Sequence, residues 1–547
     1  MRSRPSRDPR RQKAVRTAVG LVACLVWCAG CAAVLGFEDT TVRAGNDGGP
    51  NEGGPGRDGD ITPDGGTSLT TTPASVIVRV GKTADITVDV ARGGDATGPI
   101  TIRLTNLPSG VTATTATLDP ASSSGKVTLS AAATAALGAK TITLTAEGTP
   151  YPPAQLPLLV ADAPGALDKT WGTDGLASDL SKGVGATFYA LAQQSDGPVL
   201  AGGGGLAGSP QAGWMLRRFA ANGTPDAAFN AAAAAPAPAD GDLRALAVDA
   251  TGKIICVGAS TQGVGPQLLT VARFLPTGAI DSGFAGGVVR FSLAEGALGS
   301  IGLGLAIQAD GSVVVVGSRR DAGNVESGVI TRYKMNGTRD TAFNGGNTIV
   351  IPTSRLVGVS ILASGAVLAG GSSTSGALPS YFLARRNPQG AADPTFGTGG
   401  TAAFGNTYRA NGFALLPGGS LAVVGDVQQG TPAYTAGVAN DQGVATFARA
   451  FAVSAAAGFY GIAIQDDKRF IAAGHTAVAN GEARVERILT DGNKDTTFGA
   501  SGTATIKTGG AGAFDVTLFA AAVQADGRIL VAGNRSNAGA SVYRLWP

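Results

Sequence analysis

The sequence predicts an all-β protein in which a seven-bladed β-propeller is preceded by a small β-sandwich. A unit of about 50 to 60 residues recurs seven times from Leu167 to Pro547, a period typical of propellers, solenoids and arrays. The segment before it alternates apolar and polar residues as strands do. Glycine is abundant, at 83 residues, and charged residues make up only 15% of the chain. This composition suits short strands joined by many tight turns.

The first 30 residues resemble an export signal that ends in a lipidation site. Seven basic residues and one acidic residue precede an apolar run from Ala18 to Gly30, the order found in secretory signals. The run has about 13 residues, whereas a membrane-spanning helix needs about 20. The sequence Cys28-Ala29-Gly30-Cys31 resembles a bacterial lipobox, which implies that Cys31 is lipidated and becomes the new N-terminus.

Other interpretations of this signal stay open. Cys28 stands where lipoboxes usually have Leu, and Leu21–Cys24 also fits the pattern. A plain cleaved signal and an uncleaved anchor are further alternatives. Ala32 follows the preferred cysteine, and by resemblance to other lipoproteins the lack of Asp there implies the outer membrane. We therefore expect an exported protein that is lipid-anchored in the outer membrane and faces the periplasm or the cell surface.

Charge and cysteine content narrow the function classes. The formal net charge is +3, but residues 1–30 carry more positive charge than that, so the remainder is net negative. A nucleic-acid partner is therefore not expected. After Cys24 and Cys28 in the signal, only Cys31 and Cys256 remain, so lipidation of Cys31 would leave no internal disulfide. Cys256 lies in an apolar run and is expected to be a buried thiol rather than a nucleophile.

Residues 31–67 are predicted to be a disordered tether. Segments such as Asn46–Pro50 and Gly56–Asp60 are rich in Gly, Pro and Asp. So few apolar residues cannot offset the conformational entropy that folding costs. The Asp-Gly pairs lack the regular ligand loop of a calcium site, so we expect a solvated tether that holds the folded part away from the membrane.

Residues 68–162 are predicted to form the sandwich. Stretches such as Val76–Val80, Asp85–Val90 and Ile100–Leu104 alternate between apolar and polar residues and are separated by turn residues, which indicates a β-sandwich. Leu107–Val111 resembles a loop of bacterial immunoglobulin-like domains, so the resemblance implies an immunoglobulin-like sandwich. We expect it to act as a spacer, with binding of a surface ligand as the alternative.

Residues 163–547 contain the repeats. One unit reads A-apolar-Q-x-D-G-x-apolar-x-x-x-G, then a variable stretch, then apolar-x-R-aromatic and G-x-x-D-x-x-F. A clear copy is Ala306–Gly317 followed by Arg332–Phe343. The turn glycine of the first part recurs at Gly197, Gly252, Gly311, Gly365, Gly419, the equivalent Lys468, and Gly527. Each unit predicts four antiparallel strands without helical periodicity, so seven units predict a seven-bladed propeller. A β-solenoid is the alternative, although its coils repeat at shorter periods.

This pattern resembles the delta-60 repeat family of bacterial β-propeller repeats, whose function is uncharacterised. The resemblance runs from Leu167 to Pro547 and is most specific where Ala306–Gly317 joins Asn336–Asn344. It implies a propeller in a secreted bacterial protein. It supplies no reaction, cofactor or ligand that could be carried over to this chain.

An Arg and an Asp hold fixed positions in most units and predict structural ion pairs. The pairs are Arg218 with Asp226, Arg273 with Asp281, Arg332 with Asp340, Arg385 with Asp393, and Arg487 with Asp495. The chain can reverse between the two residues, which would let guanidinium and carboxylate meet. In the fifth unit Val438 and Thr446 replace both charges together. Joint loss is expected of a structural pair, because a lone buried charge costs several kcal/mol.

The two ends of the repeat region are predicted to close the ring together. The last unit stops at Pro547 without its Asp-x-x-Phe turn, and the missing piece stands at the front, in Leu167–Gly175. The first strand of the region should therefore complete the last blade and remove exposed sheet edges. In this arrangement Arg544 pairs with Asp168.

Motifs for catalysis are lacking, so we expect no enzyme, metal site or cofactor. His475 is the single histidine, which rules out His-based metal clusters, and no nucleophile motif accompanies it. We expect a largely solvated loop histidine and a monomeric binding scaffold whose ligand is an unknown envelope protein or glycan. Recognition would involve the central mouth or variable loops such as Thr261–Gln267 and Asp321–Ser327. A carbohydrate-active hydrolase or lyase with paired carboxylates at the mouth, and a purely structural envelope protein, are the alternatives.

Overall fold

The computed structural model describes residues 67–93, 98–147, 151–205, 212–234, 238–261, 265–291, 298–452, 457–465, 469–476, 482–506, 516–536 and 538–547. The predicted signal, Cys31 and all of the tether except Thr67 lie outside them. The described residues are strands and turns apart from the helix α1 (Ala227–Ala234) and a short 3-10 helix at Asn344–Gly346. None of their helices has the length and apolar character needed to cross a membrane.

The first folded part is a sandwich of two sheets. The first sheet has the order β1 (Ser68–Thr72), β3 (Thr83–Ala91), β7 (Ser124–Ala131), β5 (Val111–Ala113). The second has the order β2 (Val76–Arg79), β9 (Ala154–Ala161), β8 (Gly138–Glu147), β4 (Ile100–Thr105), β6 (Ala116–Leu118). Alternate residues of each strand, such as Ile86, Val88 and Val90, point into one shared core, because successive side chains of a strand face opposite sides.

The rest of the chain folds into further antiparallel sheets, seven among the described residues. Their strands, sheet by sheet, are β11 (Thr187–Gln193), β12 (Val199–Gly204), β13 (Trp214–Phe219); β14 (Asp242–Val248), β15 (Ile254–Ser260), β16 (Leu268–Phe274), β17 (Val288–Arg290); β18 (Gly299–Ile307), β19 (Val313–Arg320), β20 (Glu326–Tyr333), β21 (Ile349–Pro352); β22 (Ser354–Ile361), β23 (Val367–Ser373), β24 (Ser380–Arg386), β25 (Thr401–Asn406); β26 (Tyr408–Leu415), β27 (Leu421–Val427), β28 (Ala433–Ala439), β29 (Ala445–Ala452); β30 (Ala457–Ile464), β31 (Phe470–Thr476), β32 (Glu482–Ile488), β33 (Thr503–Ile506); and β34 (Val516–Val523), β35 (Ile529–Arg535), β36 (Gly539–Leu545), β10 (Leu176–Asp179).

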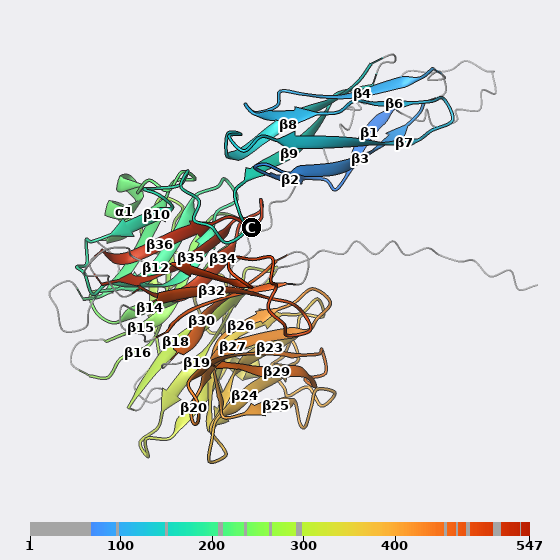
Figure 1. Cartoon of the computed structure of the whole chain (residues 1–547). Helices are drawn as coiled ribbons and strands as arrows, with labels where there is room; N and C mark the ends of the chain where they lie inside the picture. The colour runs from blue at the N-terminus through green and yellow to red at the C-terminus, as the bar shows by residue number, and fades with distance from the viewer. Residues whose placement is uncertain are drawn as a thin grey trace, which may run out of the picture.

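These sheets form a closed ring. The first strand of each sheet contacts the first strand of the next, in the order β11, β14, β18, β22, β26, β30, β34, and β34 contacts β11 again. We call these seven the inner strands. Apolar clusters fill the space between neighbouring sheets. The ring lies beside the sandwich, and the C-terminal end of the chain lies where the two meet (Figure 1). A solenoid would leave its two ends open, so the ring fits the propeller interpretation.

The last sheet is completed by the front of the repeat region. Strand β10 pairs antiparallel with β36, from Leu176 opposite Tyr543 to Asp179 opposite Ala540. A bridge between Leu167 and Leu545 extends this contact. The exposed edge of β36 is thereby covered, which protects the sheet from pairing with another chain.

One sheet departs from the four strands expected of each unit. The sheet of β11, β12 and β13 has three strands among the described residues, and α1 follows β13 where a fourth strand was predicted. The expectation that no unit carries a helix was wrong here. Six of the eight residues of α1 are alanine, the strongest helix former. Asp226 caps the helix, because its Oδ1 accepts a hydrogen bond from the Phe229 amide at 3.1 Å.

The sandwich packs directly against the ring. Trp546 is fully buried in a small cluster with Leu159 and Ala161 of β9. Arg79 donates hydrogen bonds to the main-chain oxygens of Asp162, at 2.8 Å, and Pro547, at 2.7 Å. These contacts hold the sandwich on the last sheet, so the sandwich and the ring share an interface.

The linker between the sandwich and the ring supplies a turn that the last unit lacks. The amide of Gly499 donates to the oxygen of Pro164 at 2.9 Å. Two equivalent bonds elsewhere in the ring run to a repeat turn, from Asn344 to Gln389 and from Gly172 to Asn222, both at 2.8 Å. Gly165 has φ +79, and a side chain there would press against Phe498 as one at the turn glycine Gly390 would press against Phe343. Only glycine adopts this conformation without strain.

Candidate functional site

The structure brings together the six predicted Arg and Asp pairs. The Arg Nε lies 2.6 to 2.9 Å from the Asp Oδ2 in all of them: Arg218–Asp226, Arg273–Asp281, Arg332–Asp340, Arg385–Asp393, Arg487–Asp495 and Arg544–Asp168. The Arg stands on the third strand of its sheet and the Asp in the turn that follows, except for Asp168, which comes from the front of the region.

Each pair also braces its surroundings. The second Asp oxygen accepts a main-chain amide two or three residues later, for example Ala342 to Asp340 at 3.0 Å. Each guanidinium lies over an aromatic ring, at 4.4 to 5.4 Å from the centroid: Phe229, Phe284, Phe343, Phe396, Phe498 or Trp171. Such cation–π contacts add to the ion pair when the groups are desolvated. The charged groups of the repeat are therefore engaged within the fold.

We call the six arginines of these pairs the ring arginines, and five of them also reach the next sheet. Their Nη1 atoms donate to main-chain oxygens there: Arg218 to Pro276, Arg273 to Met335, Arg332 to Pro388, Arg385 to Asp441, and Arg544 to Ala221. The acceptor always stands three residues after the corresponding arginine position of the neighbouring unit. The repeat therefore links sheet to sheet around the ring.

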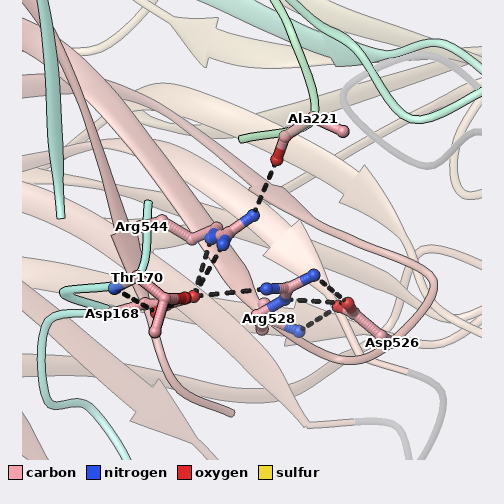
Figure 2. Close-up of polar contacts among 6 residues, drawn as sticks. All are labelled: Asp168, Thr170, Ala221, Asp526, Arg528 and Arg544. Carbon is pink, nitrogen blue, oxygen red and sulfur yellow. Dashed lines mark hydrogen bonds and ion pairs between the residues drawn. The ribbon is translucent and has the colours of Figure 1, made fainter. Parts of the chain in front are cut away.

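The pair that closes the ring, Arg544 with Asp168, also has further partners. Asp168 Oδ2 lies 2.8 Å from Arg544 and 3.3 Å from Arg528, which also pairs with Asp526 (Figure 2). Its Oδ1 accepts from the amide and the hydroxyl of Thr170, at 3.0 and 2.5 Å. Both Asp168 and Arg544 are buried.

The structure shows why the fifth unit, with Val438 and Thr446, lacks both charges. Strand β28 turns directly into β29, with Val438 opposite Phe447. In the other units a long turn containing the Asp separates the third and fourth strands, as between Tyr333 and Ile349. The pair is thus lost together with the turn that it braces, and Phe447 packs against Gly492 of the next sheet in place of the usual turn Phe.

The two ends of the ring differ in character. We call the end that carries the turn glycines (such as Gly311 and Gly527) and the Asp-x-x-Phe turns the turn face, and the opposite end the loop face. The loop face includes the connection Asp321–Val325 between β19 and β20. The sandwich packs on the turn face, where Ile77 lies next to Gly527. The regular residues of the repeat are therefore on the face that the sandwich contacts at the last sheet, and the loop face is the opposite one.

The inner strands carry a ring of seven residues, one on each strand, that was not predicted from the sequence. Each inner strand carries a β-bulge before its midpoint, and the bulged residues are Tyr189, Arg244, Leu303, Val357, Asn411, Tyr460 and Phe519. A bulge re-aims its side chain, and all seven are partly exposed. We call them the bulge ring. Each stands eight residues before the turn position, as Leu303 before Gly311, so variation at this one position was the available signal.

Aromatic residues occupy one side of the bulge ring. Tyr460 and Phe519 have ring centroids 5.1 Å apart, and Phe519 and Tyr189 are also 5.1 Å apart. The guanidinium of Arg244 lies 3.9 Å from the centroid of Tyr189. These four residues come from four consecutive sheets, so their mutual contacts place them around the axis of the ring.

Charged residues lie at the loop-face end of the inner strands on the other side. Asp426 pairs with Arg409 at 3.2 Å and accepts from Asn411 at 2.6 Å. Asp242 pairs with Arg244 at 2.7 Å. Each of these two carboxylates is thus bound to a guanidinium of its own sheet.

The remaining predicted residues lie away from any cluster of ligands. Cys256 is a buried free thiol in β15, and burial raises its pKa. His475, expected to be solvated, is half-buried at the end of β31 and stacks on Tyr460, with centroids 5.6 Å apart. The described residues contain no group of three metal-ligating side chains. Of the two variable loops, Asp321–Ser327 is described, and part of Thr261–Gln267 lies outside the described residues.

Comparison with known proteins bears on the repeats alone. No curated protein matches the chain. Among solved structures, the crystal structure of an ACO/RPE65 chimera has 11% identity and covers 75% of this chain and 90% of its own, with a TM-score of 0.34. Domains 4–9 of the surface layer protein SbsC have 13% identity, cover 88% and 81%, and have a TM-score of 0.14. These low TM-scores support no conclusion about this chain.

The repeats themselves match a family. The family described as "Domain of unknown function (DUF5122) beta-propeller" matches residues 250–284, 308–343 and 524–546. These segments contain the turn glycines Gly252, Gly311 and Gly527 and three of the ring arginines. The chain is therefore an all-β protein, and three of its repeats match this uncharacterised β-propeller family.

Proposed function

We propose that this protein is a cell-envelope lipoprotein whose seven-bladed propeller binds an envelope protein or a glycan without catalysis. In this proposal residues 1–30 are a lipoprotein signal, residues 31–67 a tether, residues 68–162 an immunoglobulin-like sandwich, and residues 163–547 the propeller. Lipid on Cys31 would place the protein in the outer membrane.

The bulge ring is the observation that carries the proposal. Repeat proteins keep their scaffold residues constant, and the constant residues here are engaged in ion pairs and links between sheets. The bulge ring differs from unit to unit and is partly exposed. It combines aromatic, amide and guanidinium groups, which is the usual composition of a recognition surface.

The pairing of the carboxylates favours binding over catalysis. Glycoside hydrolysis in most families needs two carboxyl groups that flank the bond to be cleaved. Asp426 is already engaged by Arg409 and Asn411, and Asp242 by Arg244. We therefore rank the binding scaffold above the enzyme.

Capture experiments test the binding proposal. The purified chain, immobilised, would be exposed to an envelope extract and to an array of glycans, alongside Tyr460→Ala and the control Met335→Ala. Met335 is 58% exposed on the turn face, so its removal should leave capture unchanged. Specific retention that Tyr460→Ala abolishes supports the proposal. No retention by the folded wild-type chain would instead favour a purely structural envelope protein.

Metabolic labelling with palmitate tests the anchor. Incorporation should occur in the wild-type chain and be lost in Cys31→Ser. Labelling that persists in that variant and is lost in Cys24→Ser would move the lipid to the alternative cysteine. A chain that is exported without any label would disprove lipidation.

A further inference from the structure

Three guanidinium groups gather at the loop-face end of the inner strands. Arg244 is the bulge residue of β14. Arg355 on β22 and Arg409 on β26 each stand two residues before the bulge residue of their strand. They come from three different sheets: the strands of Arg355 and Arg409 are neighbours in the ring, and the strand of Arg244 is separated from that of Arg355 by β18.

The three arginines are unequally paired. Arg244 and Arg409 have carboxylate partners at 2.7 and 3.2 Å. Arg355 has only Glu326, at 3.9 Å, and no hydrogen bond to its guanidinium is found among the described residues. Guanidinium carries five N–H donors, and the Arg355 side chain is only 32% exposed. The ring arginines, by contrast, use their donors on two or more partners each.

A second donor nearby is also unsatisfied. The Nε of Arg244 is buried and has no hydrogen-bond partner in the described part of the chain. Buried polar groups are nearly always hydrogen-bonded, and an exception requires an explanation. A bound oxoanion would satisfy the unpaired donors of the partly exposed Arg355 guanidinium.

Burial and nearby charges shift the pKa of Arg355. Burial lowers this pKa most, Glu326 raises it, Arg409 and Arg244 lower it, and Asp426 raises it, so the net shift is downward. A negative group placed among these three arginines would relieve their repulsion.

The opposite side of the bulge ring is apolar. Tyr460, Phe519 and Tyr189 form a continuous aromatic arc, and Arg244 joins this arc to the charged side by its contact with Tyr189. A ligand that spans the axis therefore meets aromatic rings on one side and cationic donors on the other. A sugar ring presents C–H groups that suit an aromatic surface, and a carboxylate suits paired guanidinium groups.

We propose that the loop-face end of the bulge ring binds an acidic saccharide, with its carboxylate held by Arg355, Arg244 and Arg409 and its ring on the arc of Tyr460, Phe519 and Tyr189. This deepens the proposed function and rests on it, because it assigns the ligand class of the same site. The hydroxyls of the sugar would find polar partners in Asn411 and Asp426, which already bond to each other.

Calorimetric titration of the full chain tests this assignment. The probes are oligogalacturonate, a neutral galacto-oligosaccharide of equal length, and acetate and sulfate as simple anions. The uronate should bind, and the neutral sugar should bind at least tenfold more weakly. Arg355→Ala should weaken uronate binding at least tenfold, and Arg355→Lys, which keeps the charge, should weaken it less. The control Arg320→Ala removes an arginine from an exposed contact with Asn324 near the loop face and should change nothing.

Several outcomes would overturn the assignment. One is a folded wild-type chain that does not bind uronate, and another is equal affinity for the neutral sugar. Binding of acetate or sulfate as tight as that of uronate would reduce the site to an oxoanion site and remove the saccharide. If uronate fails to bind while Tyr460→Ala still abolishes capture from an envelope extract, the proposed function stands and this inference falls.

Discussion

Arg79 of the sandwich takes the position of a ring arginine by donating to the main-chain oxygen of Pro547 at 2.7 Å. Pro547 stands three residues after Arg544, the position at which five other units have the oxygen that accepts from the preceding sheet's arginine. The preceding sheet's arginine, Arg487, instead bonds to Asp495 and Thr497. The sandwich thus supplies a link that the repeat supplies elsewhere.

Replacing Arg79 should loosen the sandwich from the ring. Hydrogen bonds from a charged donor contribute about 1.5 to 3 kcal/mol, so Arg79→Ala should lower the stability of the last sheet by about that amount. Hydrogen exchange of β36 amides should become faster. Arg103→Ala, which removes an exposed pair within the sandwich, is the matched control. Unchanged exchange in Arg79→Ala would show that the contact is dispensable.

Removing Arg544 should destabilise the whole ring. Asp168 is completely buried beside it, and a buried charge that loses its partner costs about 3 to 5 kcal/mol. Arg528 stays within 3.3 Å, so we expect the lower end of that range. The melting temperature of Arg544→Ala should fall clearly below that of Arg320→Ala. Equal melting temperatures would contradict the closing role of this pair.

Removing a whole pair should cost less than removing half of it. The fifth unit has Val438 and Thr446 in place of the charges, so Arg332→Val with Asp340→Thr copies an arrangement that the chain already contains. Arg332→Val alone should destabilise by about 3 kcal/mol or more, and adding Asp340→Thr should recover part of the loss. Denaturant titration of the two single variants and the double variant gives the coupling energy. Strictly additive losses would disprove the pairing.

Acid should weaken the ring through the turn aspartates. Burial raises the pKa of Asp340 and Asp495, but hydrogen bonds from main-chain amides, Thr497 and the arginines outweigh it, so both pKa values are lowered. A lowered pKa in the folded state means stability that is complete above the unfolded pKa of about 3.9 and is lost as the pH falls toward the folded value. The free energy of unfolding should therefore fall below about pH 4. Asp340→Asn should show a shallower fall over the same range, and an identical slope would contradict this origin.

Much of this architecture can be predicted from the sequence because the same motif recurs in several units. Turn glycines and Arg–Asp spacings report local geometry, and the lack of a turn after Arg544 indicates where the ring closes. The helix α1 escaped prediction because its alanines, strong helix formers, occupy a strand position of the repeat. The bulge ring escaped because a bulge depends on the register between strands, which no single strand records.

The role of the linker can be read in part from the sequence. Gly165 stands three residues before Asp168 and six before Trp171, the spacing that the turn glycine, Asp and Phe have in the other units. The contacts of Pro164 and Gly165 with Phe498 and Gly499 of the preceding sheet become clear only in the structure, because they join residues that are far apart in the sequence.

The pairing of β10 with β36 also fixes when the protein can finish folding. During synthesis β10 emerges before every other strand of the ring, and β36, its partner among the described residues, emerges last. This pairing must wait until nearly the whole chain has been made, and contacts so distant in sequence form slowly. A nascent or truncated chain that ends before Gly539 therefore lacks the last strand pair of the ring, although β34 and β35 can already contact β11.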